Sequence, residues 1–129
     1  MIGSNAFNYI NVLDKAADAS WTRNEILSNN IANDDTPGYK RKDVQFESYL
    51  QAALMGDSSL DHRVAGVNLN TLNATIYTDN AGLSYRLDGN NVDIDTESSY
   101  LAQNQIRYYS LLDSMTQEFS RLKTVLQSR

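Results

Sequence analysis

Residues that break helices are confined to the first part and the centre of the chain, and this distribution limits the possible folds. The 129 residues include one proline, Pro37, and six glycines, which all lie between Gly3 and Gly89. Residues 4–36 and 90–129 contain neither residue type. Because Gly and Pro are disfavoured inside helices, the pattern predicts two long terminal helices around an irregular centre.

Both terminal segments repeat at alternating intervals of four and three residues. This is the heptad spacing of helices that pack side by side in a coiled coil. In the first segment the repeating positions are Ala6, Ile10, Leu13, Ala17, Ser20, Asn24, Leu27 and Ile31. In the last segment they are Leu101, Gln105, Tyr108, Leu112, Met115, Phe119, Leu122 and Leu126. We expect the large apolar members to form an assembly seam, buried between protomers or against the other helix.

The predicted organisation has three parts: an N-terminal helix over residues 1–33, a middle region over 34–94 and a C-terminal helix over 95–129. Acidic residues begin the last helix, where they suit the positive end of the helix dipole, and Asp95 is the expected N-cap. The fold class that follows is mainly α, with coiled-coil-like terminal helices.

The middle region combines several local patterns. Residues 43–55 carry apolar side chains at helical spacing and predict a short amphipathic helix. Residues 57–73 are polar and are expected to be mobile. Residues 75–78 and 83–87 are rich in strand formers with a turn sequence between them, so a β-hairpin is predicted at about 75–87.

The composition argues against several functions. A formal net charge of −5 repels a phosphate backbone, and Lys40-Arg41-Lys42 is interpreted as a solvated loop, so no nucleic-acid binding is expected. The absence of Cys excludes thiolate metal sites and a cysteine nucleophile. No apolar run approaches the ~18 residues of a membrane span. Because the N-terminal residues do not resemble a secretory signal, we expect a cytosolic protein or another export route.

No pattern for catalysis, cofactor binding or metal binding is found. The sole histidine, His62, lies in a polar stretch and is interpreted as a surface residue. The acidic run from Asp88 to Glu97 lacks the glycine that a calcium-binding loop requires, and helix capping explains it more simply. We therefore expect no enzyme activity, no cofactor and no metal.

The most unusual segment ends the first helix. It reads Ser28-Asn29-Asn30-Ile31-Ala32-Asn33-Asp34-Asp35-Thr36-Pro37-Gly38-Tyr39-Lys40. Asn33 suits the left-handed conformation that ends many helices, and Pro37-Gly38 suits the centre of a type II turn with a positive φ at Gly38. Asn is a poor helix former, so Asn30 and Asn33 are candidates for anchoring the loop through side-chain hydrogen bonds. An ordinary helix end would explain the segment equally well.

This segment resembles the N-terminal signature of bacterial flagellar rod and hook proteins, Ser-x-Asn-Ile-Ala-Asn-x-x-Thr-Pro-Gly-Tyr. Every fixed position is present between Ser28 and Tyr39. Asp88-Gly89-Asn90-Asn91-Val92-Asp93 and Asn104-Gln105-Ile106-Arg107-Tyr108 resemble the C-terminal pattern of the short proximal-rod members. The longer members carry large β-domains between the same two helices, for which 129 residues leave no room.

The resemblance implies a structural subunit of the proximal rod of the flagellar basal body. Such subunits are exported unfolded from the cytosol through the flagellar type III apparatus and polymerise helically with other axial proteins to form the motor drive shaft. The implied partners are other copies of the chain, other flagellar rod proteins, a rod-to-ring adaptor and components of the export gate. Two alternatives are a soluble helical adaptor or chaperone-like interaction protein, and an enzyme.

One further motif has two interpretations. Phe46 and Leu50 resemble the Phe-x-x-x-apolar motif by which early flagellar substrates dock at the export gate. Residues four apart share one helix face, so the same pair could equally pack a short helix against the fold.

Overall fold

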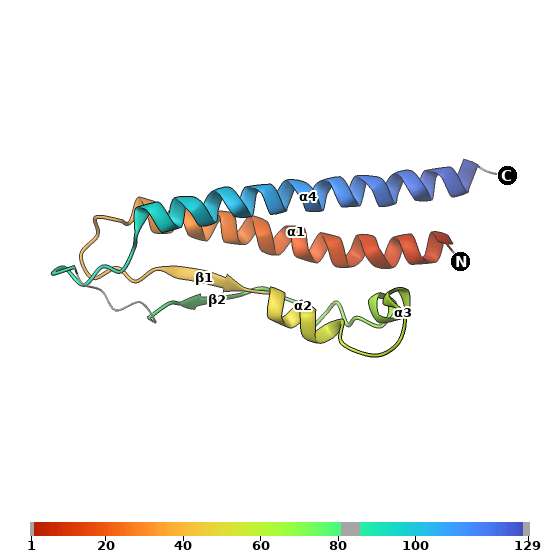
Figure 1. Ribbon diagram of the computed structural model, residues 1–129, viewed down its shortest axis with the longest axis horizontal. Helices are drawn as coiled ribbons and strands as arrows, with labels where there is room; N and C mark the ends of the chain where they lie inside the picture. Colours follow the sequence, from red (N-terminus) through yellow and green to blue (C-terminus); the bar gives the residue numbers. More distant parts are fainter. Residues whose placement is uncertain (1, 81–85, 128–129) are drawn as a thin grey trace.

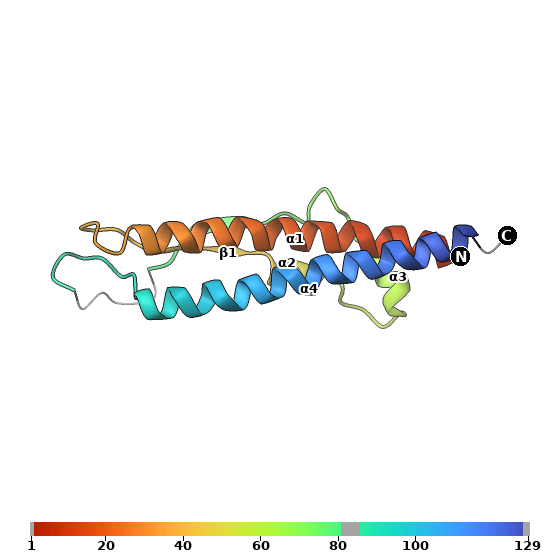
Figure 2. The same cartoon turned by 90° about the horizontal axis from the view of Figure 1, so that it is seen from above.

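The computed structural model describes residues 2–80 and 86–127 as an elongated molecule (Figure 1). Its elements in chain order are α1 (Ile2–Ala32), β1 (Lys42–Gln45), α2 (Glu47–Ala53), α3 (Leu60–Ala65), β2 (Thr75–Thr78) and α4 (Ile94–Gln127). The two long helices lie side by side and antiparallel, and the middle region lies along α1 (Figures 1 and 2). This confirms the predicted, mainly α architecture.

α1 buries two of its faces. On the first, the heptad positions Ala6, Ile10, Ala17, Ser20 and Leu27 are buried, as the periodicity predicts. On the second, Ala16 and Ala19 form a small apolar core with Phe46 and Leu72 of the middle region. α1 therefore lies between α4 and the middle region, which explains its high content of small side chains.

α4 begins one residue earlier than predicted, and Asp93 is its N-cap. Its Oδ1 accepts hydrogen bonds from the backbone N–H groups of Asp95 and Thr96 at 3.1 and 3.3 Å. The backbone carbonyl of Asp93 accepts the first helical bond, from the N–H of Glu97 at 2.9 Å. The expectation that Asp95 caps the helix was wrong, because Asp95 lies within the first turn.

The helix predicted over residues 43–55 is shorter, because its first residues form a strand. β1 pairs antiparallel with β2, with Asp43 opposite Tyr77 and Val44 opposite Ile76. Residues 75–78 thus form the predicted strand, but its partner is β1. Of the second strand expected at 83–87, residues 83–85 lie outside the described residues, and residues 86–87 lie in a bend and a turn.

The polar stretch 57–73, expected to be mobile, contains the one-and-a-half-turn helix α3. Ser59 caps this helix by accepting the N–H of His62 at 3.3 Å. Val64 and Leu72 are buried and anchor the stretch to the rest of the fold. Across residues 2–80 and 86–127, no helix combines the length and the apolar character that a bilayer span requires.

Candidate assembly site

The signature loop after α1 contains a tight turn at Pro37 and Gly38. The N–H of Tyr39 donates to the carbonyl of Thr36 at 3.2 Å, and Gly38 has φ +73°, as in a type II turn. The N–H of Gly38 donates to the carbonyl of Asp88 at 2.7 Å. The turn is therefore joined to the segment that precedes α4.

Asn30 lies at the centre of this site and is 0% exposed. Its Nδ2 donates to the carbonyl of Lys42 at 2.7 Å and to Oε2 of Glu97 at 3.0 Å. Its Oδ1 accepts from the N–H of Lys42 at 3.0 Å and from the Tyr39 hydroxyl at 3.1 Å. One side chain thus joins α1, the loop, β1 and α4.

Asn33 and Asn90 hold the end of α1. Asn33 Nδ2 donates to the carbonyl of Asn29 at 2.8 Å, and its Oδ1 accepts from the Thr36 hydroxyl at 3.0 Å. Asn33 has a negative φ, so the expected left-handed conformation was wrong, and these side-chain bonds end the helix without it. Asn90, 0% exposed, donates to the carbonyls of Asn33, Asp34 and Thr36 at 2.8, 3.0 and 2.9 Å.

Next to Asn30, Arg41 lies among three carboxylates. Its guanidinium donates to Glu97, to Asp79 at 2.6 Å and to Asp43 at 3.0 Å. The solvated-loop interpretation was therefore wrong for Arg41, because two of its partners are remote in sequence: Asp79 directly follows β2, and Glu97 lies on α4. Burial lowers the pKa of Arg41, but its hydrogen bonds to Glu97 and Asp43 outweigh burial and raise that pKa.

A second arginine completes the charged cluster. Arg23 of α1 donates to Asp43 at 2.8 Å, and the guanidinium groups of Arg23 and Arg41 lie 5.5 and 5.6 Å from the centre of the Tyr100 ring. Burial raises the pKa of Asp43, but hydrogen bonds from Arg23, from the Val44 N–H and from Arg41 outweigh burial and lower that pKa. Asp43 therefore stays ionised at neutral pH and holds β1 against the helices.

The contact between α1 and α4 is polar at its middle. Asn104, which is 1% exposed, donates from Nδ2 to the carbonyl of Ser20 at 2.7 Å. The small side chains at Ala17 and Ser20 allow α4 to approach the α1 backbone this closely. The helices are thus joined by a specific hydrogen bond where apolar packing is weakest.

The predicted seam of α4 divides into two rows. Leu101, Tyr108, Met115 and Leu122 are half-buried, as expected of residues that face α1. The alternate members of the predicted seam are exposed: Leu112 by 37%, Phe119 by 51% and Leu126 by 64%. The corresponding row that is buried or half-buried lies one residue earlier and consists of Asn104, Leu111, Glu118 and Val125.

The exposed row of α4 continues onto α1. Phe7 and Trp21 are 54% and 51% exposed, and each follows a buried heptad position by one residue. Leu112 and Phe119 likewise follow the half-buried Leu111 and Glu118 by one residue. In a pair of antiparallel helices, side chains with this same offset lie on the same side of the pair. The Trp21 ring contacts Tyr108 with centroids 5.6 Å apart, which links the two helices at this side. We call Phe7, Trp21, Leu112, Phe119 and Leu126 the bare face.

The other predicted site residues have different surroundings. Ile10 and Leu27 are buried, and Leu13 and Ile31 are half-buried. In the signature, Ser28, Asn29, Ala32, Thr36, Pro37 and Gly38 are exposed. Phe46 is buried in the apolar core, and Leu50 packs against that core. Asn90, Arg41 and Glu97 were not predicted as site residues, although Asn90 lies within the second segment that carried the resemblance.

Within the described ranges, no group of three or more His, Asp or Glu residues is arranged to hold a metal ion. The described residues present hydrogen-bonded joints between the helices and the middle region, and an exposed apolar face. These features are typical of an elongated structural protein.

Comparison with known proteins identifies the family. Residues 10–40 match the family model described as flagella basal body rod protein. The chain is 38% identical over 116 residues to the flagellar basal body rod protein FlgB of Bacillus subtilis (strain 168), covering 88% of this chain and 89% of the relative. It is 34% identical over 115 residues to FlgB of Escherichia coli (strain K12), covering 82% and 83%. The chain therefore belongs to the FlgB family of flagellar basal body rod proteins.

A more distant relative agrees. FlgB of Borreliella burgdorferi is 31% identical over 115 residues, covering 81% of this chain and 85% of the relative. Membership of this family makes the chain a structural component of the flagellar basal body, and not an enzyme.

Proposed function

We propose that this chain is a subunit of the proximal rod and polymerises helically with its own copies and with other flagellar rod proteins to form the motor drive shaft. The observation that carries the proposal is the orientation of α4. This helix places Asn104 and Glu118 on the row nearer α1 and leaves Leu112, Phe119 and Leu126 on the exposed row. A protein that functions alone would gain stability if α4 turned Leu112, Phe119 and Leu126 toward α1 instead.

Burial of the bare face would contribute to the free energy of assembly. Fully burying a Leu or Phe side chain contributes roughly 1.5–3 kcal/mol, and the exposed fractions of Leu112, Phe119 and Leu126 are 37%, 51% and 64%. Apolar patches of this kind on a protein surface mark contacts with other proteins. Contacts between unlike surfaces that do not close into a ring generate a filament, as a rod requires.

Export as an unfolded chain through the flagellar type III apparatus is the second part of the proposal. Phe46 is 7% exposed and lies in the core, so the Phe46–Leu50 pair is covered in the folded protein. Docking at the export gate through this pair therefore requires an unfolded segment, which suits a chain that folds only after export. A rod-to-ring adaptor is a further proposed partner at the base of the rod.

The bare face is tested by Leu112→Asp and Phe119→Asp, with Ser110→Asp on the same helix as the matched control. Each position is exposed, so all three variants should be expressed and retain the helical circular dichroism of the parent. We expect the first two to abolish swimming and to leave basal bodies without a proximal rod in electron micrographs, while the control swims. Normal rods in both Leu112→Asp and Phe119→Asp strains would refute the assignment. A closed oligomer of defined size would instead favour an adaptor.

The export motif is tested by the double change Phe46→Ala and Leu50→Ala. Because Phe46 is buried, this variant loses stability as well as the motif, and Leu72→Ala, another change in the same core, is the matched control. If the pair docks at the gate, the double variant accumulates in the cytosol while Leu72→Ala is still secreted. Equal secretion of both variants would remove the docking role and leave core packing.

A further inference from the structure

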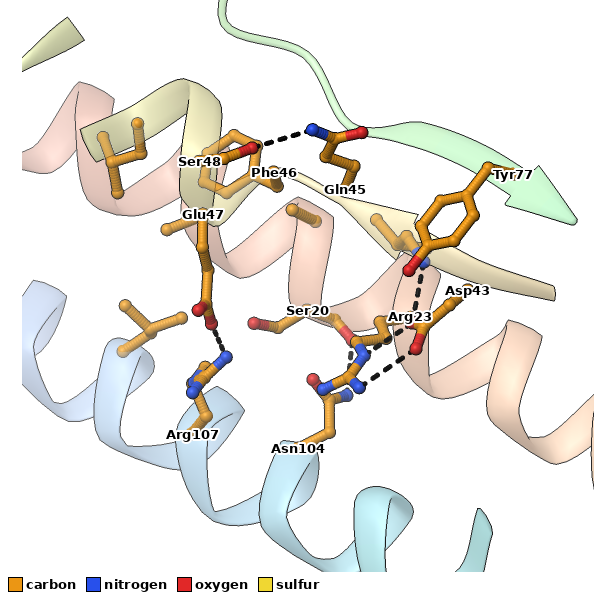
Figure 3. Close-up of a pocket in the computed structure, with 15 residues that line it drawn as sticks. Ser20, Arg23, Asp43, Gln45, Phe46, Glu47, Ser48, Tyr77, Asn104 and Arg107 are labelled. Atoms are coloured by element: carbon orange, nitrogen blue, oxygen red, sulfur yellow. Dashed lines mark hydrogen bonds and ion pairs between the residues drawn. The ribbon is translucent and has the colours of Figure 1, made fainter. Parts of the chain in front are cut away.

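A groove of about 930 Å³ lies between α1, α4 and the β1–α2 segment (Figure 3). Its apolar lining is formed by Ala16, Ala19, Val44, Phe46, Leu50 and Leu111. Two of these side chains are methyl groups, so the groove can admit large side chains of a partner. Its volume is within the range of sites that bind other molecules.

One polar group in the groove lacks a partner. Asn104 is 1% exposed and its side-chain amide points into the groove in Figure 3. Nδ2 donates to Ser20, but within the described part of the chain Oδ1 has no hydrogen-bond partner. A buried acceptor without a partner is unfavourable, so a donor brought by a second chain would stabilise it.

An ion pair between Glu47 of α2 and Arg107 of α4 crosses the groove (Figure 3). The two side chains are 68% and 51% exposed, and exposed ion pairs contribute little to stability. The pair can therefore separate at small cost. Its separation would widen the groove and free the Glu47 carboxylate for another cation.

We propose that this groove receives α4 of a second copy of the chain, an inference that rests on the proposed polymerisation. The inserted surface is one row of α4, at spacings of three and four residues: Tyr109, Leu112, Thr116, Phe119, Lys123 and Leu126. Such a row presents one helix face to a groove.

The chemistry of this row matches the groove. Phe119 and Leu112 suit the apolar floor, and Phe119 is flanked by the hydroxyl of Thr116 and the ammonium group of Lys123. These two groups lie about 10 Å apart on the helix. Within one copy the Thr116 hydroxyl donates to the Leu112 carbonyl at 3.0 Å, so it must leave that bond to donate in the region of Asn104, while the Lys123 ammonium group approaches Glu47. The groove supplies the acceptor and the carboxylate, and the row supplies the donor and the cation.

The two surfaces lie on different sides of the helix pair. Arg23 and Arg107 line the groove and each precede a heptad contact position by one residue, whereas Phe7 and Leu112 follow such positions by one. The contact is therefore between unlike surfaces, and one copy can use both at once. Repetition gives an open chain of subunits instead of a closed dimer.

Engineered disulfides test the contact directly, because the chain contains no cysteine. The full-length chain carrying Ser48→Cys, on the groove wall, and Thr116→Cys, on the exposed row, is expressed in place of the natural chain and oxidised in isolated basal bodies. We expect a ladder of multimers on non-reducing gels, since each subunit is linked at both positions. The matched control carries Ser48→Cys and Ser110→Cys, whose second position is exposed on another side of α4.

Each outcome decides a different question. A ladder from the Ser48/Thr116 pair that is absent from the control, with peptide mapping of the 48–116 link, supports the groove contact. Basal bodies that contain the protein but give no ladder, or an equal ladder from the control, overturn the groove contact and leave the rod assignment intact. If both variants and the parent chain are absent from basal bodies under reducing conditions, the proposed function itself fails.

Discussion

Replacing Asn30 by alanine is the most direct test of how the signature segment works. The side chain is 0% exposed and forms four hydrogen bonds that connect α1 to Tyr39, Lys42 and Glu97. Asn30→Ala removes all four without adding volume or charge. If the segment is only a helix end, the substitution should have almost no effect, since Ala is the better helix former.

The magnitude follows from the groups left behind. The N–H and the carbonyl of Lys42 both lose their side-chain partner, and Glu97, 1% exposed, loses one donor. An unpaired buried polar group costs roughly 1–3 kcal/mol, and Glu97 retains Arg41 as a partner. Because water can reach part of the Lys42 backbone, we expect the free energy of unfolding to fall by about 2–4 kcal/mol in total.

Urea unfolding of the purified full-length chain, followed by circular dichroism at 222 nm, measures this difference. The matched control is Asn29→Ala, whose exposed side chain donates only to the Tyr39 hydroxyl at 3.1 Å, and we expect it to change stability by less than about 1 kcal/mol. Equal stabilities of the two variants would refute the role of Asn30 as the joint between α1 and β1.

Three further predictions concern single residues. Gly38→Val should lower stability by roughly 1–2 kcal/mol through its φ of +73° alone, since a side chain there meets no atom within 4 Å, and Gly66→Ala, at φ −85°, should be tolerated. Ion pairing with Arg23 and Arg41 lowers the pKa of Asp43. The stabilisation from these ion pairs is therefore present above the unfolded pKa of Asp43, about 4, and is lost as the pH falls through the lower folded pKa. Asp43→Asn should therefore be less stable at pH 7 and flatten the acid limb of a pH–stability profile. His62→Ala should change neither stability nor swimming, because the side chain is exposed.

The features that the sequence predicted correctly are local. Pro37 and Gly38 define a type II turn because φ at these positions is set by the residues themselves. The heptad row of α1 was also predicted, since residues at spacings of three and four share one face of a helix. In both cases the residues that determine the structure lie within a few turns of one another.

The features that the sequence did not predict depend on partners that are remote in the chain. Arg41 lies in a run of three basic residues and would be solvated if Asp79 and Glu97 did not converge on it from other elements. Residues 43–45 form a strand because Asn30 holds the backbone of the preceding residue, Lys42, and because β2 pairs with β1. Neither contact could be read from the helical spacing of apolar residues at 43–55.

The division of the α4 seam has a different physical origin. Two rows of α4, 104/111/118/125 and 105/112/119/126, differ by one residue. Periodicity favours the second row because it carries Gln, Leu, Phe and Leu, whereas the first carries Asn, Leu, Glu and Val. The folded chain turns the first row toward α1 and so pairs Asn104 with the Ser20 carbonyl. A heptad pattern shows only which helix face is apolar. It cannot distinguish a face that packs within the same chain from a face that packs against another subunit. In a subunit that must bind neighbours, the more apolar row is best kept for the contact that forms last, and this is the row that α4 exposes.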